Sequence, residues 1–525
     1  MEESKGKILW VDDEIELLRP HIRLLLDKGY TVETATNGED AVTLVKQSGF
    51  DLVFLDEMMA GMGGLRTLAE IKDIRPNLPV VMITKNEEES LMEEAIGVKI
   101  SDYLTKPVNP SQILMVCKKF LELKRITGAA VSKDYIQEFN TISLALMNEL
   151  KYQDWIDIYS RLVAWSMELD EHAELGLKRT LTDQIRECNL AFGKYVEKHY
   201  RDWLESTDGE ARRPILSPEV VDRFVIPELG TGKSVIFFVI DCLRLDQWLL
   251  MEHLLHDYFT ISKQYYFSIL PTATPYSRNA IFSGSYPSDV ELRFPELWEK
   301  SEDDENSRNR FERQFLEKLL ERRKVVVKPE PKYVKILDAE FGRGIENTIN
   351  SYAQTKLTSI VVNFVDMLAH GRSDSSLLKE IAPDESAYRS LTKSWFLHSS
   401  LFGMLKTLSK NKNVTVLLTT DHGSIRSLRG SKVLGDREAS TNLRYKYGRN
   451  LKCEEKGAVF VKNPLDFKLP KRGVAINYII AKEDYYFVYP TDYHKYLNQY
   501  RDSFQHGGIS MEEMILPVVK LEPKG

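Results

Sequence analysis

The sequence predicts an α/β protein with several domains. Two separate stretches alternate short apolar runs, which are typical of buried β-strands, with helical patterns. A third stretch between them has helical periodicity only, and 525 residues are too many for one ordinary domain. We therefore expect an α/β domain over residues 1–122, a helical bundle over 123–205, a linker over 206–232 and a larger α/β domain over 233–525.

The composition argues against two classes of protein. The formal net charge of -7 gives no electrostatic reason to expect binding to duplex DNA. The longest apolar runs are of strand length and the first residues are acidic and polar, so we expect neither membrane insertion nor a secretory signal. The four cysteines show no framework spacing, which favours a reducing, cytoplasmic location.

In the first domain, polar side chains follow the apolar runs. Asp12 and Asp13 follow one run, Asp56 follows the next, and Thr84 and Lys106 follow two later runs. Clustered carboxylates suit Mg²⁺, which prefers oxygen ligands. Asp56 between them is a candidate nucleophile toward a phosphoryl donor. Lys106 and Thr84 would then supply a charge and a hydroxyl to the incoming phosphoryl group.

These residues resemble the receiver domain of two-component response regulators, and the resemblance covers the whole segment. It implies a flavodoxin-like fold in which a sensor histidine kinase causes phosphorylation of Asp56. It also implies that Asp12 and Asp13, with Asp56, bind Mg²⁺. The implied switch residues are Thr84, Tyr103 and Lys106.

The middle of the chain changes to apolar spacings of three and four residues. This spacing over residues 123–203 predicts a bundle of about three helices, in which the Trp and Met residues pack a core. The segment Ser206 to Leu216 is polar and rich in breakers, which is typical of a linker.

Three strand-like runs in the last domain lead into carboxylates. Ser234 to Asp241 and Ser359 to Asp366 each end in an aspartate, and the run from Val414 leads to a further Asp-His pair. A fourth contribution comes from the segment QHGGIS, in which two glycines let the backbone pass close to a site. Such a set has the composition expected for two zinc ions, each with an open position. The candidate ligands are Asp241, Asp366, His370, Asp421, His422 and His506.

The segment PTATPYSRNA offers two candidate nucleophiles. Pro275 is well placed as the first residue of a helix, which makes Thr274 the expected N-cap and leaves Thr272 freer to face the metals. We therefore favour Thr272 as nucleophile and keep Thr274 as the alternative. Arg278 and Asn279 on the same helix are candidates for a phosphate contact, or they are surface residues.

The order of these residues resembles the alkaline phosphatase superfamily, in particular domains of the PglZ type. The resemblance implies that one zinc is bound by Asp241, Asp421 and His422 and the other by Asp366, His370 and His506. Members with a threonine nucleophile act on phosphodiesters, which favours that substrate class here. A sulfatase would need a Cys-x-Pro-x-Arg segment, and the run CLRLD after Asp241 lacks the proline. A phosphomonoesterase remains an alternative.

Together, the three parts resemble the PorX-type response regulators of the type IX secretion system. The resemblance implies a homodimer formed on phosphorylation and an output domain that acts on cyclic or linear oligonucleotides. It further implies contacts with an extracytoplasmic-function sigma factor and a secretion-motor membrane protein. The competing hypothesis is a signalling adaptor whose zinc site is structural, although such a site would be closed by four protein ligands.

Two further segments are rich in charge. Residues 299–324 form a charged, helix-rich insertion, which we expect to be a solvated face. Residues 434–456 mix basic and aromatic side chains, and they predict either a solvated loop or a groove for nucleic-acid phosphates.

Overall fold

The computed structural model describes most of the chain, and the chain divides into two compact units, Met1–Gln137 and Glu138–Gly525. The described residues are 5–76, 78–85, 100–172, 176–206, 213–298, 309–436, 440–471, 473, 475–491 and 493–524. Among the helices in these ranges, none combines the length and the hydropathy needed to cross a bilayer.

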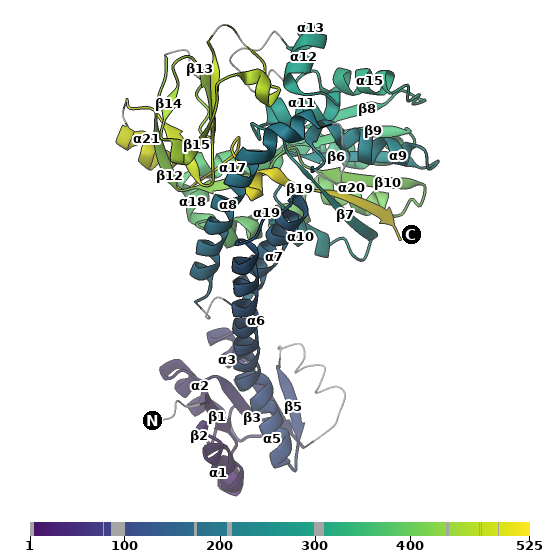
Figure 1. Ribbon diagram of the computed structural model, residues 1–525. Coiled ribbons are helices and arrows are strands. Elements are labelled where there is room, and N and C mark those ends of the chain that lie inside the picture. Colours follow the sequence, from purple (N-terminus) through teal and green to yellow (C-terminus); the bar gives the residue numbers. More distant parts are fainter. Residues whose placement is uncertain are drawn as a thin grey trace. The chain divides into compact units, whose positions relative to one another are not determined.

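The first unit contains a five-stranded parallel sheet in the order β2-β1-β3-β4-β5 (Figure 1). Apolar residues of α1 and α5 pack on one face of the sheet, and those of α2 and α3 pack on the other. This is the predicted flavodoxin-like arrangement. The elements are β1 (Lys7–Val11), α1 (Arg19–Asp27), β2 (Thr31–Ala35), α2 (Gly38–Gln47), β3 (Leu52–Asp56), α3 (Gly64–Ile74), β4 (Val80–Thr84), β5 (Asp102–Thr105) and α5 (Pro110–Cys117).

Long helices occupy the predicted helical region. They are α6 (Leu123–Ala145), α7 (Tyr152–Glu171) and α8 (Lys178–Glu205). An aromatic cluster joins α7 and α8 to the larger α/β domain. Trp155 of α7 packs with Phe192 of α8, and Phe192 and Trp203 of α8 both pack on Phe267 of that domain. The second compact unit therefore includes α7 and α8 as well as the α/β domain.

The prediction of a linker over residues 206–232 is wrong for the second half of that range. Residues 207–212 lie outside the described part of the chain. Beyond them, Leu216, Val220 and Val225 are buried, and the two valines belong to the core of the second unit. Short helical turns and α9 (Ile226–Leu229) place these apolar side chains against the sheet. The apolar residues that follow the breaker-rich stretch therefore make this segment part of the domain.

The second unit is built on a six-stranded sheet in the order β7-β19-β10-β6-β9-β8 (Figure 1). Strands β10, β6, β9 and β8 are parallel, whereas β19 runs antiparallel to both β10 and β7. Every residue of β9 and β10 is buried, as expected for strands covered on both faces. The strands are β6 (Ser234–Ile240), β7 (Phe259–Phe267), β8 (Lys332–Ile336), β9 (Leu357–Val362), β10 (Val414–Thr419) and β19 (Ile515–Pro523).

Helices and three small sheets complete this unit. The helices are α10 (Leu245–His253), α11 (Thr274–Ser283), α12 (Pro287–Arg293), α13 (Pro295–Trp298), α15 (Glu312–Arg322), α16 (Ala339–Tyr352), α17 (Phe364–Asp374), α18 (Ser376–Ile381), α19 (Glu385–His398), α20 (Ser400–Leu408), α21 (Tyr493–Tyr500) and α22 (Met511–Met514). The short strands are β11 (Ile425–Ser427), β12 (Arg429–Leu434), β13 (Tyr445–Gly448), β14 (Lys452–Cys453), β15 (Ala458–Val461), β16 (Asn477–Ala481), β17 (Tyr485–Val488) and β18 (Ser503–Gln505). They pair as β11-β18, β14-β12-β17 and β13-β16-β15.

Candidate functional site

The first unit gathers carboxylates at the carboxyl ends of its strands. Asp12 follows β1 and Asp56 ends β3, and both are buried. Asp12, Asp13 and Asp56 each offer an oxygen within 4.8 Å of the others. Lys106 follows β5 and places its Nζ 2.9 Å from both Asp12 Oδ2 and Asp56 Oδ1. The structure thus brings together four of the five residues that the sequence suggested for phosphoryl transfer.

The charge balance of this cluster favours a bound cation. Burial raises the pKa of Asp56, the contact with Lys106 lowers it, and Asp12 raises it further, so that the net change is a rise. Burial lowers the pKa of Lys106, but hydrogen bonds to Asp12 and Asp56 more than offset this and raise it. One lysine therefore faces three carboxylates, which is a donor set that fits Mg²⁺.

Two of the three suggested switch residues, Thr84 and Tyr103, lie in neighbouring strands. Thr84 ends β4 and is buried, whereas Tyr103 in β5 is 45% exposed. The threonine hydroxyl is thus held at the same strand ends as Asp56, while the tyrosine ring is accessible to solvent.

The first candidate ligand set of the second unit lies at the carboxyl ends of two neighbouring parallel strands, β6 and β10. Asp241 follows β6, and Asp421 and His422 follow β10. All three side chains are buried, and His422 Nε2 lies 3.6 Å from Asp241 Oδ1 and 3.7 Å from Asp421 Oδ2. His422 Nδ1 lies 3.0 Å from the carbonyl oxygen of Gly423, which can only accept. Nδ1 therefore donates, and the Nε2 lone pair faces the carboxylates.

These carboxylates are difficult to ionise without a cation. Burial raises the pKa of Asp241 to about 7 and that of Asp421 to about 6, against the lowering effect of Arg278. Burial also lowers the pKa of His422, which favours the neutral imidazole. Asp421 Oδ2 is buried and accepts no hydrogen bond within the described residues. An orphaned carboxylate oxygen beside a neutral imidazole fits a divalent cation such as zinc.

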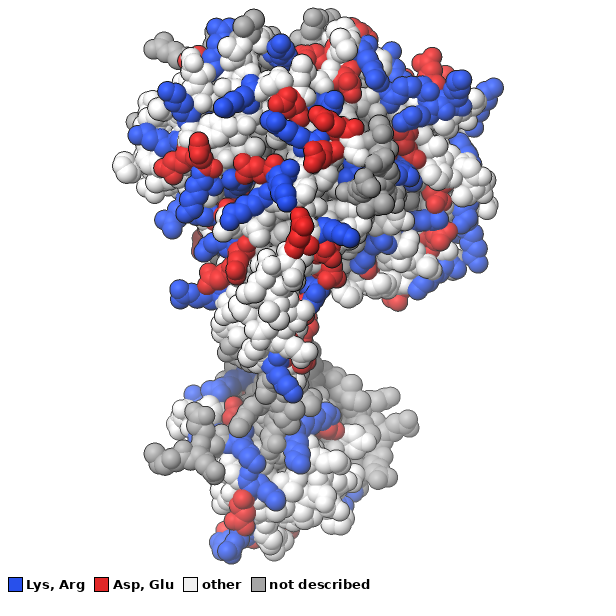
Figure 2. Space-filling view, viewed as in Figure 1, with Lys and Arg blue, Asp and Glu red and all other residues white. Residues whose placement is uncertain are grey.

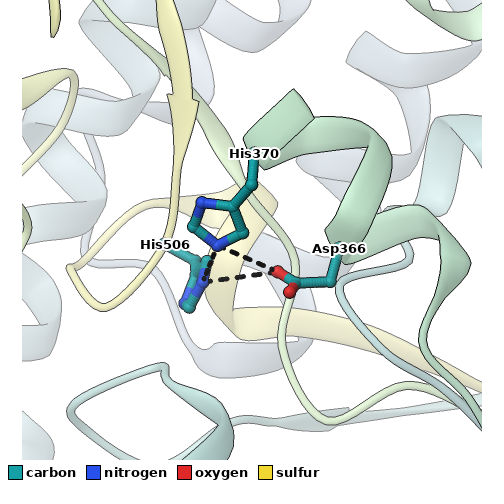
Figure 3. A group of neighbouring side chains, drawn as sticks. All are labelled: Asp366, His370 and His506. Atoms are coloured by element: carbon teal, nitrogen blue, oxygen red, sulfur yellow. Dashed lines mark hydrogen bonds and ion pairs between the residues drawn. The ribbon is translucent and has the colours of Figure 1, made fainter. Parts of the chain in front are cut away.

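The second set consists of Asp366, His370 and His506 (Figure 3). Its aspartate was expected to end a strand, and this expectation is wrong. Strand β9 ends at Val362, and Asp366 lies in the first turn of α17. The four-residue spacing to His370 puts both side chains on one face of that helix, with His370 Nε2 3.4 Å from Asp366 Oδ1.

His506 reaches the same oxygen from a different element. It follows β18, and its Nε2 lies 3.5 Å from Asp366 Oδ1 and 3.4 Å from His370 Nε2. Burial raises the pKa of Asp366, but the two imidazoles outweigh this effect and lower it. Two histidines and a carboxylate that is readily ionised also have the chemistry of a zinc site.

The two sets are adjacent. The rings of His422 and His506 stack with centroids 4.2 Å apart, so that one histidine of each set touches the other. The backbone after His506 passes close to its neighbours as the two glycines suggested, because a Cβ at Gly508 would overlap the carbonyl oxygen of Ala481. The buried carboxylate of Glu513 accepts a hydrogen bond from Gly508 N at 2.8 Å and holds this turn.

The structure places the two threonines differently from the expectation that Thr274 caps the helix and Thr272 faces the metals. The N-cap of α11 is Ala273, and Thr274 is its first residue. Thr274 Oγ1 lies 2.9 Å from His422 Nε2 and 3.4 Å from Asp241 Oδ1. Thr272 is buried, and its hydroxyl donates to Gly508 O at 2.7 Å and accepts from Gly507 N at 3.1 Å. Thr274 therefore faces the ligand set, whereas Thr272 fastens the turn after His506.

Arg278 lies one helical turn after Thr274, but it does not face open space. It is 1% exposed, and it donates from Nη1 to Asp241 Oδ2 at 2.7 Å and from Nε to Glu312 Oε1 at 2.6 Å. The expectation of a surface residue is therefore wrong, and the contact with phosphate stays a prediction. Asn279 is also buried, and its amide donates to Pro275 O at 3.0 Å.

Glu312 is a site residue that the sequence reasoning missed. It begins α15, inside the charged insertion that was expected to be a solvated face, yet it is fully buried. Asn309 and the hydroxyl of Tyr333 also donate to its carboxylate. In a run with many acidic and basic residues, no feature of spacing distinguishes this glutamate from its exposed neighbours. Residues 299–308 of the insertion lie outside the described part of the chain.

Comparison with protein-family models agrees with this architecture, and fold and site together define a response regulator with an alkaline phosphatase-like output domain. The model of the response regulator receiver domain matches residues 8–118, and that of the PorX response regulator linker domain matches 125–204. The model of the BREX system PglZ alkaline phosphatase-like domain matches 220–521, which is more than half of the chain. The chain belongs to this PglZ family, and the order of its three parts is that of PorX-type response regulators.

Curated relatives match over the length of a receiver domain. The alginate biosynthesis transcriptional regulatory protein AlgB of Pseudomonas syringae pv. tomato is 37% identical over 126 residues, which is 24% of this chain and 28% of that protein. The transcriptional regulatory protein ResD of Bacillus subtilis is 30% identical over 119 residues, which is 22% of this chain and 49% of that protein. The chain thus spans less than two thirds of the length of these relatives.

Solved structures that resemble this chain are receiver domains. The chemotaxis protein CheY4 of Vibrio cholerae is 29% identical, with 22% of this chain and 98% of that chain covered and a TM-score of 0.22. The receiver domain of NtrX from Brucella abortus is 33% identical, with 22% and 98% covered and a TM-score of 0.21.

Proposed function

We propose that phosphorylation of Asp56 by a sensor histidine kinase controls a two-zinc phosphodiesterase in the second unit. The observation that carries the proposal is the position of the Thr274 hydroxyl, 2.9 Å from His422 Nε2 and 3.4 Å from Asp241 Oδ1. A hydroxyl in the open position of a three-residue ligand set is typical of a catalytic site, because a structural site is closed by four protein ligands. A phosphoesterase-type enzyme is also what an alkaline phosphatase-like domain suggests.

Under this proposal, the residues of the two ligand sets bind metal and Thr274 is the nucleophile. One set would hold a zinc through Asp241, Asp421 and His422, and the other through the residues of Figure 3. Zinc ions in these sets would supply positive charge beside the attacking and leaving oxygens of the phosphoryl group. Thr274 Oγ1 forms a bond to phosphorus as one ester oxygen leaves, and water then cleaves the phosphothreonine. The N-terminus of α11 favours negative charge on the hydroxyl oxygen during attack.

The family architecture supports a particular substrate class. A threonine nucleophile supports phosphodiesters over monoesters, and the PorX-type order of domains supports cyclic or linear oligonucleotides and a role in controlling type IX secretion. The visible face of the molecule mixes acidic and basic side chains (Figure 2), so that long-range attraction of a polyanion does not select the substrate on that face. Selection would then depend on contacts close to the two ligand sets.

The test is hydrolysis of bis(p-nitrophenyl) phosphate and of a short cyclic oligonucleotide by zinc-loaded protein. We expect Thr274→Val to reduce kcat by about 1,000-fold or more, because the nucleophile is removed. Thr272→Val is the matched control, since the two residues differ by two positions and the same atoms are changed. It should retain kcat within about tenfold. Equal loss in both variants, at equal zinc content, would contradict the assignment of Thr274.

The alternative is an adaptor that binds a sigma factor or a secretion-motor protein and has no catalytic output. Protein that holds two zinc ions and hydrolyses neither diesters nor p-nitrophenyl phosphate would favour this alternative. Turnover of the monoester alone would instead assign a phosphomonoesterase.

A further inference from the structure

A cavity of about 340 Å³ that is partly open to solvent lies in the second unit, and its lining contains none of the residues of the two ligand sets. Helices α7 and α8 form one side of it. The opposite side comes from the α/β domain, through the segment after β6, the start of α19, β11 and α22. Cavities of roughly 300–1,000 Å³ at the junction of structural parts are typical of small-molecule sites.

One wall of the cavity is apolar. Leu162 and Val163 of α7 and Leu181 and Ile185 of α8 line it, and Met511 of α22 continues it on the opposite side. Of these, Leu162, Leu181 and Met511 are at least nine-tenths buried. This wall would accept the hydrocarbon part of a ligand.

The polar part of the lining has an excess of acid, with seven acidic and five basic residues. The buried arginines already have partners. Arg244 donates to Asp246 and Glu385, and Arg389 donates to Asp246 and Asp170. The other basic lining residues are paired as well, Lys178 with Asp170, Arg186 with Asp183 and Arg426 with Asp502. The positive charge of the lining is therefore already paired with carboxylates.

Two carboxylates of the lining are less well satisfied. Glu512 accepts hydrogen bonds from Asn189 Nδ2 at 3.0 and 3.2 Å, and it forms no ion pair with any described residue. Asp484 is 7% exposed; its Oδ1 pairs with Arg429, whereas its Oδ2 is buried and accepts no hydrogen bond from the described residues. Buried carboxylate oxygens without a cationic donor are costly, and a ligand that supplies one would relieve this cost.

We propose that this cavity is a binding site for a small organic cation. The positive group would lie against the acidic wall formed by Glu512 and Asp484, and the apolar part would lie against α7 and α8. The excess of acid selects a cation over an anion, and the apolar wall selects an organic cation over a metal ion. Burial raises the pKa of Glu512 to about 7, which is consistent with a carboxylate that lacks a cationic partner.

Helix α22, which carries Glu512, also contacts helix α8 and the residue that follows His422 of the first ligand set. Met511 N donates to Asn189 Oδ1 at 2.8 Å, which ties α8 to α22. The carbonyl oxygen of Glu512 packs directly on Gly423, the residue after His422. A ligand in the cavity would therefore contact the elements that join the helices to the site, and its binding is separate from the chemistry proposed above.

The test is calorimetric titration of metal-free, full-length protein with three probes of equal chain length, namely hexylammonium, hexanoate and 1-hexanol. Metal-free protein has no turnover, so the outcome does not depend on the phosphodiesterase proposal. We expect hexylammonium to bind about tenfold or more tightly than either other probe, because it alone places a cation at buried carboxylates. Equal affinity for the anion or the alcohol would overturn the proposal.

Variants of residues that line the cavity test whether hexylammonium binds there. Glu512→Gln and Asp484→Asn keep the shape and remove charge, and each should weaken hexylammonium binding by about tenfold. Ser166→Trp on α7 should block the cavity from a half-buried position, with thermal unfolding used to confirm that the variant is folded. Glu149→Gln, at a side chain that is 84% exposed, is the matched control and should bind normally. Unchanged binding in the first three variants would place the probe elsewhere and overturn the proposal.

Discussion

At the scale of the residue, buried guanidinium groups arrange the carboxylates of the output domain. Arg278 lies between Asp241 and Glu312, all three of which are almost fully buried. Removing one member of such a group is costly, because it leaves a charge without a partner in a place that water does not reach. The position of Asp241 toward a metal therefore depends on a glutamate in a different helix.

We expect Glu312→Gln to weaken zinc binding by about tenfold, which is within the range for residues that orient a metal ligand. Without the negative charge of Glu312, Arg278 would pair more strongly with Asp241 and compete with the metal. Zinc affinity, measured by competition with a chromophoric chelator, is the readout. Glu317→Gln on the same helix is the control, since Glu317 pairs with Arg313 at the surface. Identical affinities for Glu312→Gln and the unmodified protein would refute this role.

A second residue-scale prediction concerns stability in acid. Burial alone would raise the pKa of Asp246, but Arg244 and Arg389 outweigh it and lower the pKa to about 2. The folded state thus holds the carboxylate ionised more strongly than the unfolded state does. Its contribution of about 2 kcal/mol is present above pH 4 and is lost as the pH falls toward 2.

Asp246→Asn should therefore lower the free energy of unfolding by about 3 kcal/mol at pH 7, since two arginines lose a partner. The difference from the unmodified protein should shrink between pH 4 and pH 2. Urea unfolding at a series of pH values measures this. Asp183→Asn, at a side chain that is 60% exposed, is the control and should change little. A difference that stays constant down to pH 2 would contradict the assignment.

At the scale of the element, the site depends on close approaches of loops. Gly423 follows His422, and a Cβ there would overlap the carbonyl oxygen of Glu512. The turn after His506 is held by hydrogen bonds with the side chains of Thr272 and Glu513. Both histidines that stack, His422 and His506, are thus followed by segments in close contact with neighbouring backbone or side chains.

We expect Gly423→Ala to lower the free energy of unfolding by about 2–3 kcal/mol and to weaken zinc binding, because α22 must move away from the loop. Gly344→Ala in α16 is the control, since nothing lies within 4 Å of its Cβ position. Alanine there should stabilise the helix by about 0.5–1 kcal/mol. Thermal unfolding with and without zinc distinguishes the two. A Gly423→Ala protein as stable as the unmodified one would show that the contact is not tight.

The sequence predicted the strands and helices better than it predicted which side chains contact one another. The runs at 234–240 and 414–419 are continuous and apolar, which identifies buried strands, and the carboxylates that follow them were found for that reason. Asp366 was placed on a strand because its apolar run continues past Val362, although the spacing to His370 is helical. The burial of Glu312 depends on its tertiary contact with Arg278, which leaves no periodic signal in the sequence.

At the scale of the whole molecule, Asp56, the proposed phosphorylation site, and the candidate ligand sets belong to different compact units. Helix α6 contains the boundary between these units. A signal from Asp56 to the output domain must therefore act through the connection between units or through association of chains. We propose the second route, a homodimer formed on phosphorylation, as the PorX-type architecture implies.

We expect sedimentation velocity to show a monomer that becomes a dimer when an acyl-phosphate donor and Mg²⁺ are added. Asp56→Asn should stay monomeric, because it cannot be phosphorylated. Asp102→Asn, in the same unit but paired with Lys119 at the surface, is the control and should dimerise normally. An unchanged monomer of phosphorylated protein would argue against the dimer.

Strand β19 lies between β7 and β10, and it is the only hydrogen-bonded neighbour of β7 among the described strands. The chain after β7 leads to Thr274, and the turn after His506 leads into β19. Loss of β19 would therefore remove the strand partner of β7 and disturb the segments that lead to Thr274, the proposed nucleophile, and away from His506. Under the proposed function, a shortened chain of this kind would keep Asp56 for phosphorylation but lose its output. In a cell that also makes the full chain, it would act as a dominant-negative competitor for the kinase.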